Sequence, residues 1–454
     1  MKRVFSSTRL CIGVAAVAMF VTGCISFNPD EARQDHIAGF SSSLSDLAAE
    51  HLNRPLSLDD CIAIAMTNNY AVRTAELDRK LGQLGRDLSF TAFLPNVAAT
   101  AGYTMNAKEP LMQDKHSASG SISAGVPLFM PSSWFLYSAA KHGKVSSEIA
   151  AAYVRQGIVL QTTVNYFNVL VLDETIVALE TQVASANEEA ARIEGLAGEG
   201  FFTDWERDQA RFMAEAREME LNVARRQLAV SRGNFLIDMG LSPMADVTLS
   251  GDIGTVERLA GTVADHVLTA LTVHPELALA DRAVIIGEEN VRKAFTDFLP
   301  TLSLTSALNW TTDDVAKHSA NWVTGFGAVW NVFTGFANQT LYRASKVERD
   351  RSRLEQESTF LSVMIRVISA EASVDNAEER QRILRRAYEV AQARHADYAA
   401  KVEEGLLPLS DALDARSDME LAQVEYLRAR YDARIAMANL ELAMGLTALP
   451  EPGA

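Results

Sequence analysis

The side chains best suited to nucleophilic or metal chemistry are sparse in this 454-residue sequence, which has three cysteines and eight histidines. The histidines are scattered, and no two of them have the spacing of a metal-binding motif. The sequence contains no phosphate-binding loop, zinc motif or nucleophile elbow. It therefore predicts neither an enzyme nor a protein that holds a cofactor or metal.

Cys24 is the cysteine whose setting predicts a covalent modification. Basic residues precede an apolar run from Leu10 to Val21, which is short for a membrane span and has the length of a signal-peptide core. The run ends in Val21-Thr22-Gly23-Cys24, which resembles a bacterial lipobox. We therefore expect residues 1–23 to be a signal peptide and Cys24 to carry lipid; the alternative is an ordinary cleaved signal. By resemblance to such lipoproteins, Ile25 in place of Asp favours the outer membrane.

The other two cysteines predict no further chemistry. Cys11 leaves with the signal peptide, so Cys61 remains without a cysteine partner in the chain. Cys61 lies in an apparent amphipathic helix from Leu58 to Met66, where a buried and inert thiol is expected.

Long helices form the frame of this chain. No Gly or Pro occurs from Leu341 to Glu404, which predicts one helix of about 96 Å. The chain then breaks at Gly405-Leu406-Leu407-Pro408 and turns helical again from Asp411 to Met444. A short break between two helices makes them antiparallel neighbours. The return helix is shorter, so we expect it to stack end to end with a helix near Leu277–Phe295 along the long one.

The whole arrangement occurs twice. Pairs of matching residues recur at a constant offset of 205 positions, without drift in register. The matched segments are Phe93-Leu94-Pro95 with Phe298-Leu299-Pro300, Leu136-Tyr137 with Leu341-Tyr342, Lys141 with Lys346, Gly200 with Gly405, Ala210-Arg211 with Ala415-Arg416, and Met239-Gly240-Leu241 with Met444-Gly445-Leu446. This unit is much longer than a solenoid repeat, so the sequence predicts two copies of a domain-sized element.

Each copy contains two segments with the alternation of a membrane β-strand. From Ser117 to Gly125, serines and a glycine occupy the odd positions, and mostly apolar residues occupy the even positions as far as Leu128. The expected strands are about 97–106, 117–130, 302–311 and 319–332. A soluble half-buried sheet would alternate too. The export signal and the small polar inner faces favour a membrane barrel. Four strands cannot close a barrel, so several chains must share one, and three chains would supply twelve strands.

The predicted division of the chain follows from these features. Residues 1–23 are the signal peptide, 24–55 a lipid-anchored tether with one short helix, 56–241 the first copy, 242–262 a connection, 263–446 the second copy and 447–454 a tail. The hairpin turns fall near 198–202 and 405–408. The fold class is mainly α with membrane β, in two tandem hairpins.

At this point the sequence resembles the TolC-like outer-membrane efflux channel family. The resemblance rests on Leu56-Ser57-Leu58-Asp59-Asp60-Cys61-Ile62-Ala63-Ile64-Ala65 with Asn68-Asn69, on Phe93-Leu94-Pro95, on Ser410-Asp411-Ala412-Leu413-Asp414-Ala415-Arg416 after Gly405, and on Met444-Gly445-Leu446. It implies a homotrimer with a twelve-stranded outer-membrane barrel and a periplasmic helical tunnel. It also implies transport without catalysis, driven by an inner-membrane pump through a periplasmic adaptor.

The resemblance also implies roles for residues at the hairpin turns. The family's entrance is narrowed by acidic residues after the second turn, which correspond to Asp411 and Asp414 here. Three copies of each would form a carboxylate ring that attracts cations; alternatively, they cap or salt-bridge within the hairpin. The first copy departs from this pattern, with Glu206 and Gln209 at the matching positions. The adaptor would dock on the apolar tips, at Gly200, Phe201, Gly405 and Leu406.

Charge and architecture limit the remaining classes. The net charge is −16 and no Lys/Arg-rich run occurs, so the sequence predicts no nucleic-acid partner. The acidity is either a solvated surface or the lining of a cation-passing pore. A periplasmic adaptor would have one hairpin and a compact β domain, and a structural envelope lipoprotein would need no barrel. Drug or metal efflux and type I protein secretion use the same channel architecture.

Overall fold

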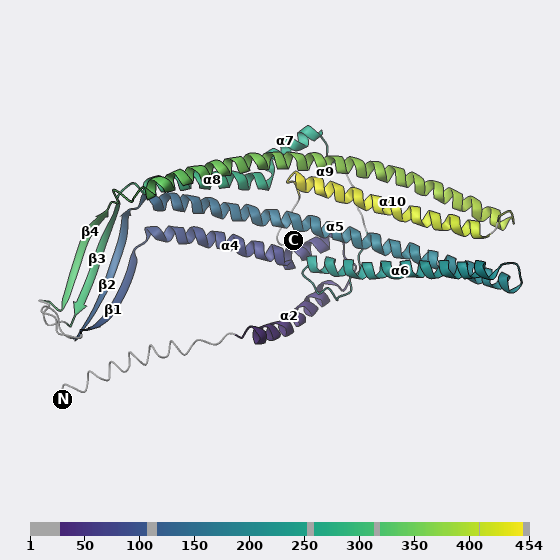
Figure 1. Cartoon of the computed structure of the whole chain (residues 1–454), viewed down its shortest axis with the longest axis horizontal. Helices are drawn as coiled ribbons and strands as arrows, with labels where there is room; N and C mark the ends of the chain where they lie inside the picture. The colour runs from purple at the N-terminus through teal and green to yellow at the C-terminus, as the bar shows by residue number, and fades with distance from the viewer. Residues whose placement is uncertain (1–27, 107–115, 252–257, 313–317, 408, 448–454) are drawn as a thin grey trace, which may run out of the picture.

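The computed structural model describes residues 28–106, 116–251, 258–312, 318–407 and 409–447. The molecule is elongated, with a four-stranded sheet at one end and two helical hairpin turns at the other (Figure 1). Cys24 and the predicted signal peptide lie outside the described residues.

Two copies of one order of helices and strands follow each other. The first copy comprises α3 (Leu58–Asn68), α4 (Tyr70–Phe90), the 3-10 turn η1 (Thr91–Phe93), β1 (Asn96–Met105), β2 (His116–Phe129), α5 (Pro131–Gly198) and α6 (Asp204–Asp238). The second comprises α7 (Val263–Val273), α8 (Pro275–Thr296), β3 (Thr301–Thr311), β4 (Ala320–Val329), α9 (Ala337–Glu403) and α10 (Leu409–Ala443). The predicted tandem fold of two long hairpins with two strands each is therefore confirmed.

Each copy is built on one long helix, α5 with 68 residues and α9 with 67. A shorter pair lies end to end along each of them: α4 and α6 on α5, and α8 and α10 on α9 (Figure 1). Because α5 also contacts α8 and α10, the helices form successive layers of α4 with α6, then α5, then α8 with α10, then α9. None of the helices in the described ranges combines the length and apolar character needed to cross a bilayer.

The short helices of both copies begin with the same capping device. The Ser57 hydroxyl accepts a hydrogen bond from the Asp60 backbone N–H at 3.2 Å, while the Asp60 carboxylate accepts one from the Ser57 backbone N–H at 3.1 Å. Thr262 and Asp265 repeat this exchange at the start of α7. Such capping boxes satisfy N–H groups that the first turn of a helix leaves unpaired.

A cluster of three aromatic rings joins the helices to the sheet in each copy. The ring centroids are 5.7 to 6.0 Å apart in the first cluster and 6.1 to 6.4 Å apart in the second. The rings are Phe90, Phe93 and Tyr137 in the first copy and Phe295, Phe298 and Tyr342 in the second. One pair in each cluster is edge-to-face, Phe93 with Tyr137 and Phe298 with Tyr342. Such ring contacts stabilise the junction, which gives the repeated Phe-Leu-Pro motif a physical role.

The sheet is antiparallel in the order β1-β2-β3-β4, and its two faces differ in polarity. One row across the sheet is Ala99, Ile122, Leu308 and Trp322, and the next is Thr100, Ser121, Asn309 and Asn321. Because successive residues of a strand point to opposite faces, one face is apolar and the other polar. β1 and β4 form the two edges, and neither has a second strand partner among the described residues.

Aromatic side chains explain two local features of the sheet. A Cβ atom on Gly120 would lie 2.0 Å from the Trp310 ring, so this glycine makes room for the indole. β4 ends at Val329, short of the expected end at residue 332. The cause is the next residue, Trp330, whose indole N–H donates to the Phe298 carbonyl at 3.0 Å as the chain turns toward α9.

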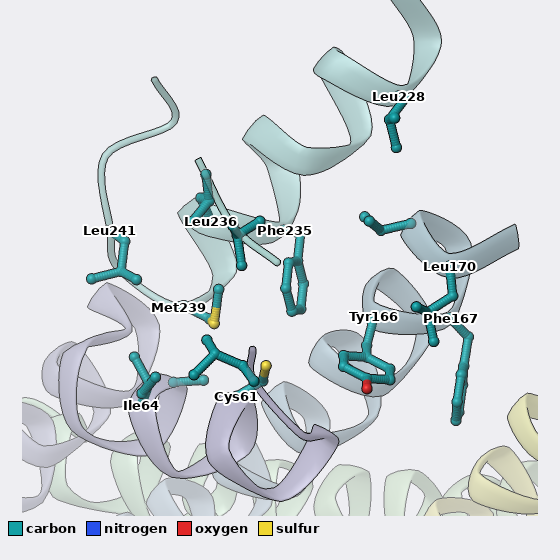
Figure 2. Packing of buried hydrophobic residues seen from close by; sticks show 14 of the residues in the cluster. Cys61, Ile64, Tyr166, Phe167, Leu170, Leu228, Phe235, Leu236, Met239 and Leu241 are labelled. Carbon is teal, nitrogen blue, oxygen red and sulfur yellow. The ribbon is translucent and has the colours of Figure 1, made fainter. Parts of the chain in front are cut away.

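The core of the first copy lies where α3, α5 and α6 meet (Figure 2). Tyr166, Phe167 and Phe235 are completely buried there. Cys61 is buried in the same cluster as predicted, and burial, followed by the charge of Asp60, raises the pKa of its thiol to about 12. The core of the second copy uses smaller residues, mainly Val363, Val367 and Val374 of α9 with Met437 and Leu440 of α10.

The N-terminal segment is more ordered than the expected tether with one short helix. Helix α2 (Pro29–His51) has 23 residues and is capped by the Asn28 side chain, which accepts from the Asp30 N–H at 3.2 Å. Leu47 and Leu52 pack against the core of the first copy. The serine-rich middle of the segment hides the helical periodicity, and burial of these two leucines holds the helix in place.

His274 and Asn69 are matching residues of the two copies, and each caps the helix that follows it. Asn69 Oδ1 accepts from the Ala71 N–H at 2.8 Å, and His274 Nδ1 accepts from the Glu276 N–H at 3.2 Å. His274 is buried, which lowers the pKa of its ring; the Glu276 charge acts in the opposite direction and Arg366 in the same one. A protonated Nδ1 could not accept the capping bond.

The substitution His274→Asn should therefore reduce the pH dependence of folding stability while keeping a side-chain cap at the start of α8. In the wild type the unfolded chain binds a proton below pH about 6.5 more readily than the folded one, so stability falls as the pH falls through that value. The thermal midpoint, measured between about pH 5 and pH 8, should change less with pH in His274→Asn than in the wild type. The control His36→Asn should keep the wild-type slope, since His36 is exposed on α2. Equal slopes in the wild type and His274→Asn would contradict this assignment.

Candidate functional site

The two hairpin turns close with the same backbone geometry. Gly200 and Gly405 have φ angles of +85° and +72°, and in each case the N–H of the next residue donates back into the helix, to the carbonyl of Leu196 at 3.0 Å or of Lys401 at 2.8 Å. This is a Schellman motif, in which a left-handed residue ends a helix and glycine is favoured. Apart from the adjoining residues, no atom of the described chain lies within 4 Å of a Cβ placed on either glycine, so both turns are open on the outside.

Large apolar side chains are exposed around these turns. Phe201 and Leu406 directly follow the two glycines and are 74% and 67% exposed. Trp205, in the first turn of α6, is 64% exposed. Exposed apolar groups gathered at the end of a rod indicate a contact surface.

Asp411 and Asp414 lie about one turn apart near the start of α10. Asp411 is in the first turn, where a carboxylate interacts favourably with the positive end of the helix dipole. The pKa of Asp414 is raised, first by partial burial and then by the negative charges of Asp418, Asp411 and Glu189, while Arg394 acts in the opposite direction. A cation placed near Asp414 would relieve this repulsion.

Glu206 is engaged locally as a helix cap. Its carboxylate accepts from the Thr203 N–H at 2.8 Å and from the Thr203 hydroxyl at 2.6 Å. These hydrogen bonds lower the pKa of Glu206. The pattern of Thr203 followed by Glu206 three residues later is a capping box, so the sequence contained the signal for this role.

A groove of about 550 Å³ lies between α10 and the hairpin of α5 and α6. Phe202, Trp205 and Met213 contribute apolar surface to it. Its acidic wall residues are Glu189, Glu206 and Asp414. The groove exists because α10 of the second copy packs against α5 of the first.

The structure brings some of the predicted site residues together and leaves others apart. Glu206 and Asp414 line the same groove, whereas Asp411 is not among its lining residues. Gly200 and Gly405 lie on separate hairpins at the same end of the molecule (Figure 1). Within the described ranges, no three His, Cys, Asp or Glu side chains converge closely enough to hold a metal ion.

Sequence reasoning missed several of the groove residues. Gln182, Phe202 and Trp205 belong to no motif, and they meet Asp414 only through the packing of two hairpins. Only the apolar side chains of Phe202 and Trp205, in and next to a predicted turn, could have drawn attention to them.

Comparison with known proteins agrees with the two-copy architecture. The model of the outer membrane efflux protein family matches residues 61–234 and, a second time, residues 268–446. These two ranges correspond to the two structural copies, from α3 to α6 and from α7 to α10.

Individual proteins resemble this chain in sequence or in structure, at low sequence identity. Outer membrane protein TolC of Vibrio cholerae is 21% identical over 371 residues, which cover 79% of this chain and 83% of TolC. A membrane protein from Pseudomonas aeruginosa superposes with a TM-score of 0.73 at 18% identity, over 87% of this chain and 92% of that one. The open state of the Neisseria gonorrhoeae MtrE outer membrane channel superposes with a TM-score of 0.71 at 19% identity, over 86% of this chain and 89% of MtrE.

The family model covers most of the chain, in two consecutive matches that coincide with the two structural copies. The chain belongs to the outer membrane efflux protein family.

Proposed function

We propose that three copies of this chain join edge to edge to form the exit duct of a tripartite efflux or type I secretion system in the outer membrane. One observation carries the proposal: the fold is open on two opposite sides along its whole length. The sheet ends in β1 and β4, and the helical layers end in α4 with α6 on one side and α9 on the other. β1 follows α4 and β4 precedes α9, so each open strand lies on the same side as an open helix layer (Figure 1).

Apolar stripes on the two open helix faces support this association. Each stripe repeats every three, four or seven residues, which places its members on one side of a helix. The exposed residues are Leu77, Leu81, Leu84 and Leu88 on α4, and Leu354, Leu361, Ile365 and Ile368 on α9. Joining α9 of one copy to α4 of the next would remove both stripes from water.

Closure into a ring follows from the strands. The two open sides of one copy differ from each other, so neighbouring copies contact head to tail. This contact repeats from copy to copy until the ring closes. Membrane sheets tolerate no open edge, and four strands are too few for a barrel, whereas three copies supply twelve strands. The polar face of the sheet would then line an aqueous lumen, and the apolar face would contact lipid.

The ends of this duct have different partners. We infer that Cys24 carries a lipid that anchors the chain in the outer membrane while the helices extend into the periplasm. The exposed tips at Gly200, Phe201, Gly405 and Leu406 fit the apolar docking surface that a periplasmic adaptor needs, and an inner-membrane pump would act through that adaptor.

Acidic residues near the tips would form the entrance. Three copies of Asp411 and Asp414 around one axis would concentrate negative charge and favour cations. Glu206 would add charge near the same level, although its cap to Thr203 holds it on the helix. Burial is the first cause of the raised pKa of Asp414, and the second is repulsion by neighbouring carboxylates within the same copy.

The test is single-channel recording of the purified protein in planar bilayers, with the double variant Asp411→Ala/Asp414→Ala. We expect a cation-selective wild-type pore that divalent cations block. The double variant should have a reversal potential in a salt gradient closer to zero and weaker divalent block, because the ring charge is gone.

Asp204→Ala/Asp208→Ala is the matched control, since it removes the same charge from the other tip. Both aspartates already pair with Arg207, at 2.9 Å. A double variant of Asp411 and Asp414 that behaves like this control would leave the channel in place and return the two aspartates to a capping role. Folded protein that never inserts into bilayers would overturn the channel itself.

A further inference from the structure

We propose that the groove between α10 and the hairpin of α5 and α6 binds amphipathic organic cations. Calling such molecules cargo rests on the proposed function, whereas their binding does not. The groove has a volume of about 550 Å³, within the usual range for sites that take small organic molecules.

The apolar wall suits a flat, aromatic ligand. Phe202, Trp205 and Met213 line one part of the groove. Their rings and thioether favour stacking with aromatic surface, and an indole face also attracts cations. Trp205 is 64% exposed, so its ring is accessible from solution.

The charge in the groove selects a cation. Glu189 is bound to Arg192 at 2.6 Å, and Glu206 is engaged by Thr203. Asp414 takes part in no hydrogen bond or ion pair with other described residues. Its charged neighbours are Asp418, Asp411 and Glu189, together with Arg394, whose guanidinium is already bound to Asp418. A ligand cation is the partner that this carboxylate lacks.

The one cationic residue that lines the groove does not neutralise the charge of Asp414. Arg217 also reaches the groove, but its guanidinium donates to Glu220 at 2.8 Å. An anionic ligand would therefore meet several carboxylates and one guanidinium that is already paired.

The Gln182 side chain gives evidence for a ligand that does not depend on charge. It lines the groove, it is 3% exposed, and neither its amide nitrogen nor its amide oxygen has a hydrogen-bond partner within the described structure. A buried amide without hydrogen-bond partners is unfavourable. A ligand that carries both a donor and an acceptor would satisfy it.

A bound metal ion fits this site poorly. The groove belongs to the described part of the chain, where no three acidic, His or Cys side chains converge as metal ligands. The separated carboxylate, amide and aromatic wall suit a larger ion whose charge, polar groups and ring system are spread over several ångströms.

The test is a titration of the purified full-length protein with ethidium, a planar aromatic cation with amino groups, followed by the increase in ethidium fluorescence. The neutral probe is the parent diaminophenylphenanthridine, which lacks the fixed charge. We expect Asp414→Asn to weaken ethidium binding about tenfold or more and to change binding of the neutral parent little. Trp205→Ala should weaken both probes, since it removes stacking surface.

Asp204→Asn is the charge control, because Asp204 is exposed at the tip of the first hairpin, at the same end of the molecule, and does not line the groove. Ethidium affinity that is equal in Asp414→Asn and the wild type would overturn the proposal, and so would an equal loss in Asp204→Asn. A wild-type protein that conducts in bilayers but binds no ethidium would overturn the site and leave the channel standing. Binding that depends on Asp414 in protein without conductance would support the site on its own.

Discussion

Gly240→Ala is expected to destabilise the protein by about 3 kcal/mol or more, whereas Gly200→Ala should cost about 1 kcal/mol. Both glycines close Schellman motifs, with φ angles of +69° and +85°. They differ in their surroundings. A Cβ on Gly240 would lie 2.3 Å from the backbone oxygen of Asn68, while a Cβ on Gly200 would meet open space. The clash involves backbone, so no side-chain rotation can relieve it.

Thermal and urea midpoints of the two variants, at one protein concentration in the same detergent, measure the difference. Gly405→Ala should resemble Gly200→Ala, because its surroundings are also open. Gly445→Ala should fall between them, since its Cβ would lie 3.0 Å from the His274 Cα. If all four variants lost the same stability, the positive φ angle alone would determine the loss. The close contact between Asn68 of α3 and Gly240 at the end of α6 would then not matter.

Phe235→Ala is expected to cost about 3–5 kcal/mol of unfolding free energy. Phe235 is fully buried between Tyr166 and the helix that carries Cys61, and its ring centroid lies 6.1 Å from that of Tyr166 (Figure 2). Truncation would remove this aromatic contact and leave a cavity that the three surrounding helices can fill only in part.

The second copy supplies a graded control for this change. Leu440 occupies the position that matches Phe235 and is also buried. Phe235→Leu should therefore lose a fraction of the stability that Phe235→Ala loses, and Met244→Ala, at a position that is 91% exposed, should lose almost none. A Phe235→Ala variant with the midpoint of Met244→Ala would show that this cluster contributes little to the fold.

Much of the fold could be predicted because two of its signals are periodic. The constant offset between Gly200 and Gly405 marks equivalent turns, and the alternation from Ser117 to Leu128 marks a strand with two unlike faces. Other features depend on contacts between distant segments. The indole of Trp310 over Gly120 is one, since no pattern within either strand indicates which ring will cross to the other.

The candidate site was less predictable than the fold. Glu206 was expected near the entrance from its match to Asp411, and the capping role that it also has can be recognised in Thr203 and its spacing. The groove beside Asp414 could not be predicted. Gln182 appears in the sequence as an ordinary polar residue of a long helix, and its unpaired amide arises only where α10 covers α5.

The strand order also has a consequence for how the chain folds. β1 pairs with β2, and β3 with β4, across short connections, but β2 pairs with β3 through partners such as Ser119 and Thr311, with all of α5 to α8 between them. The entropy lost on closing a loop grows with its length, and distant contacts form more slowly than local ones. We therefore expect the two halves to assemble their own helices and strand pairs first and the β2–β3 pairing to form late, which stopped-flow refolding of single-tryptophan variants that keep only Trp310 or only Trp322 would test.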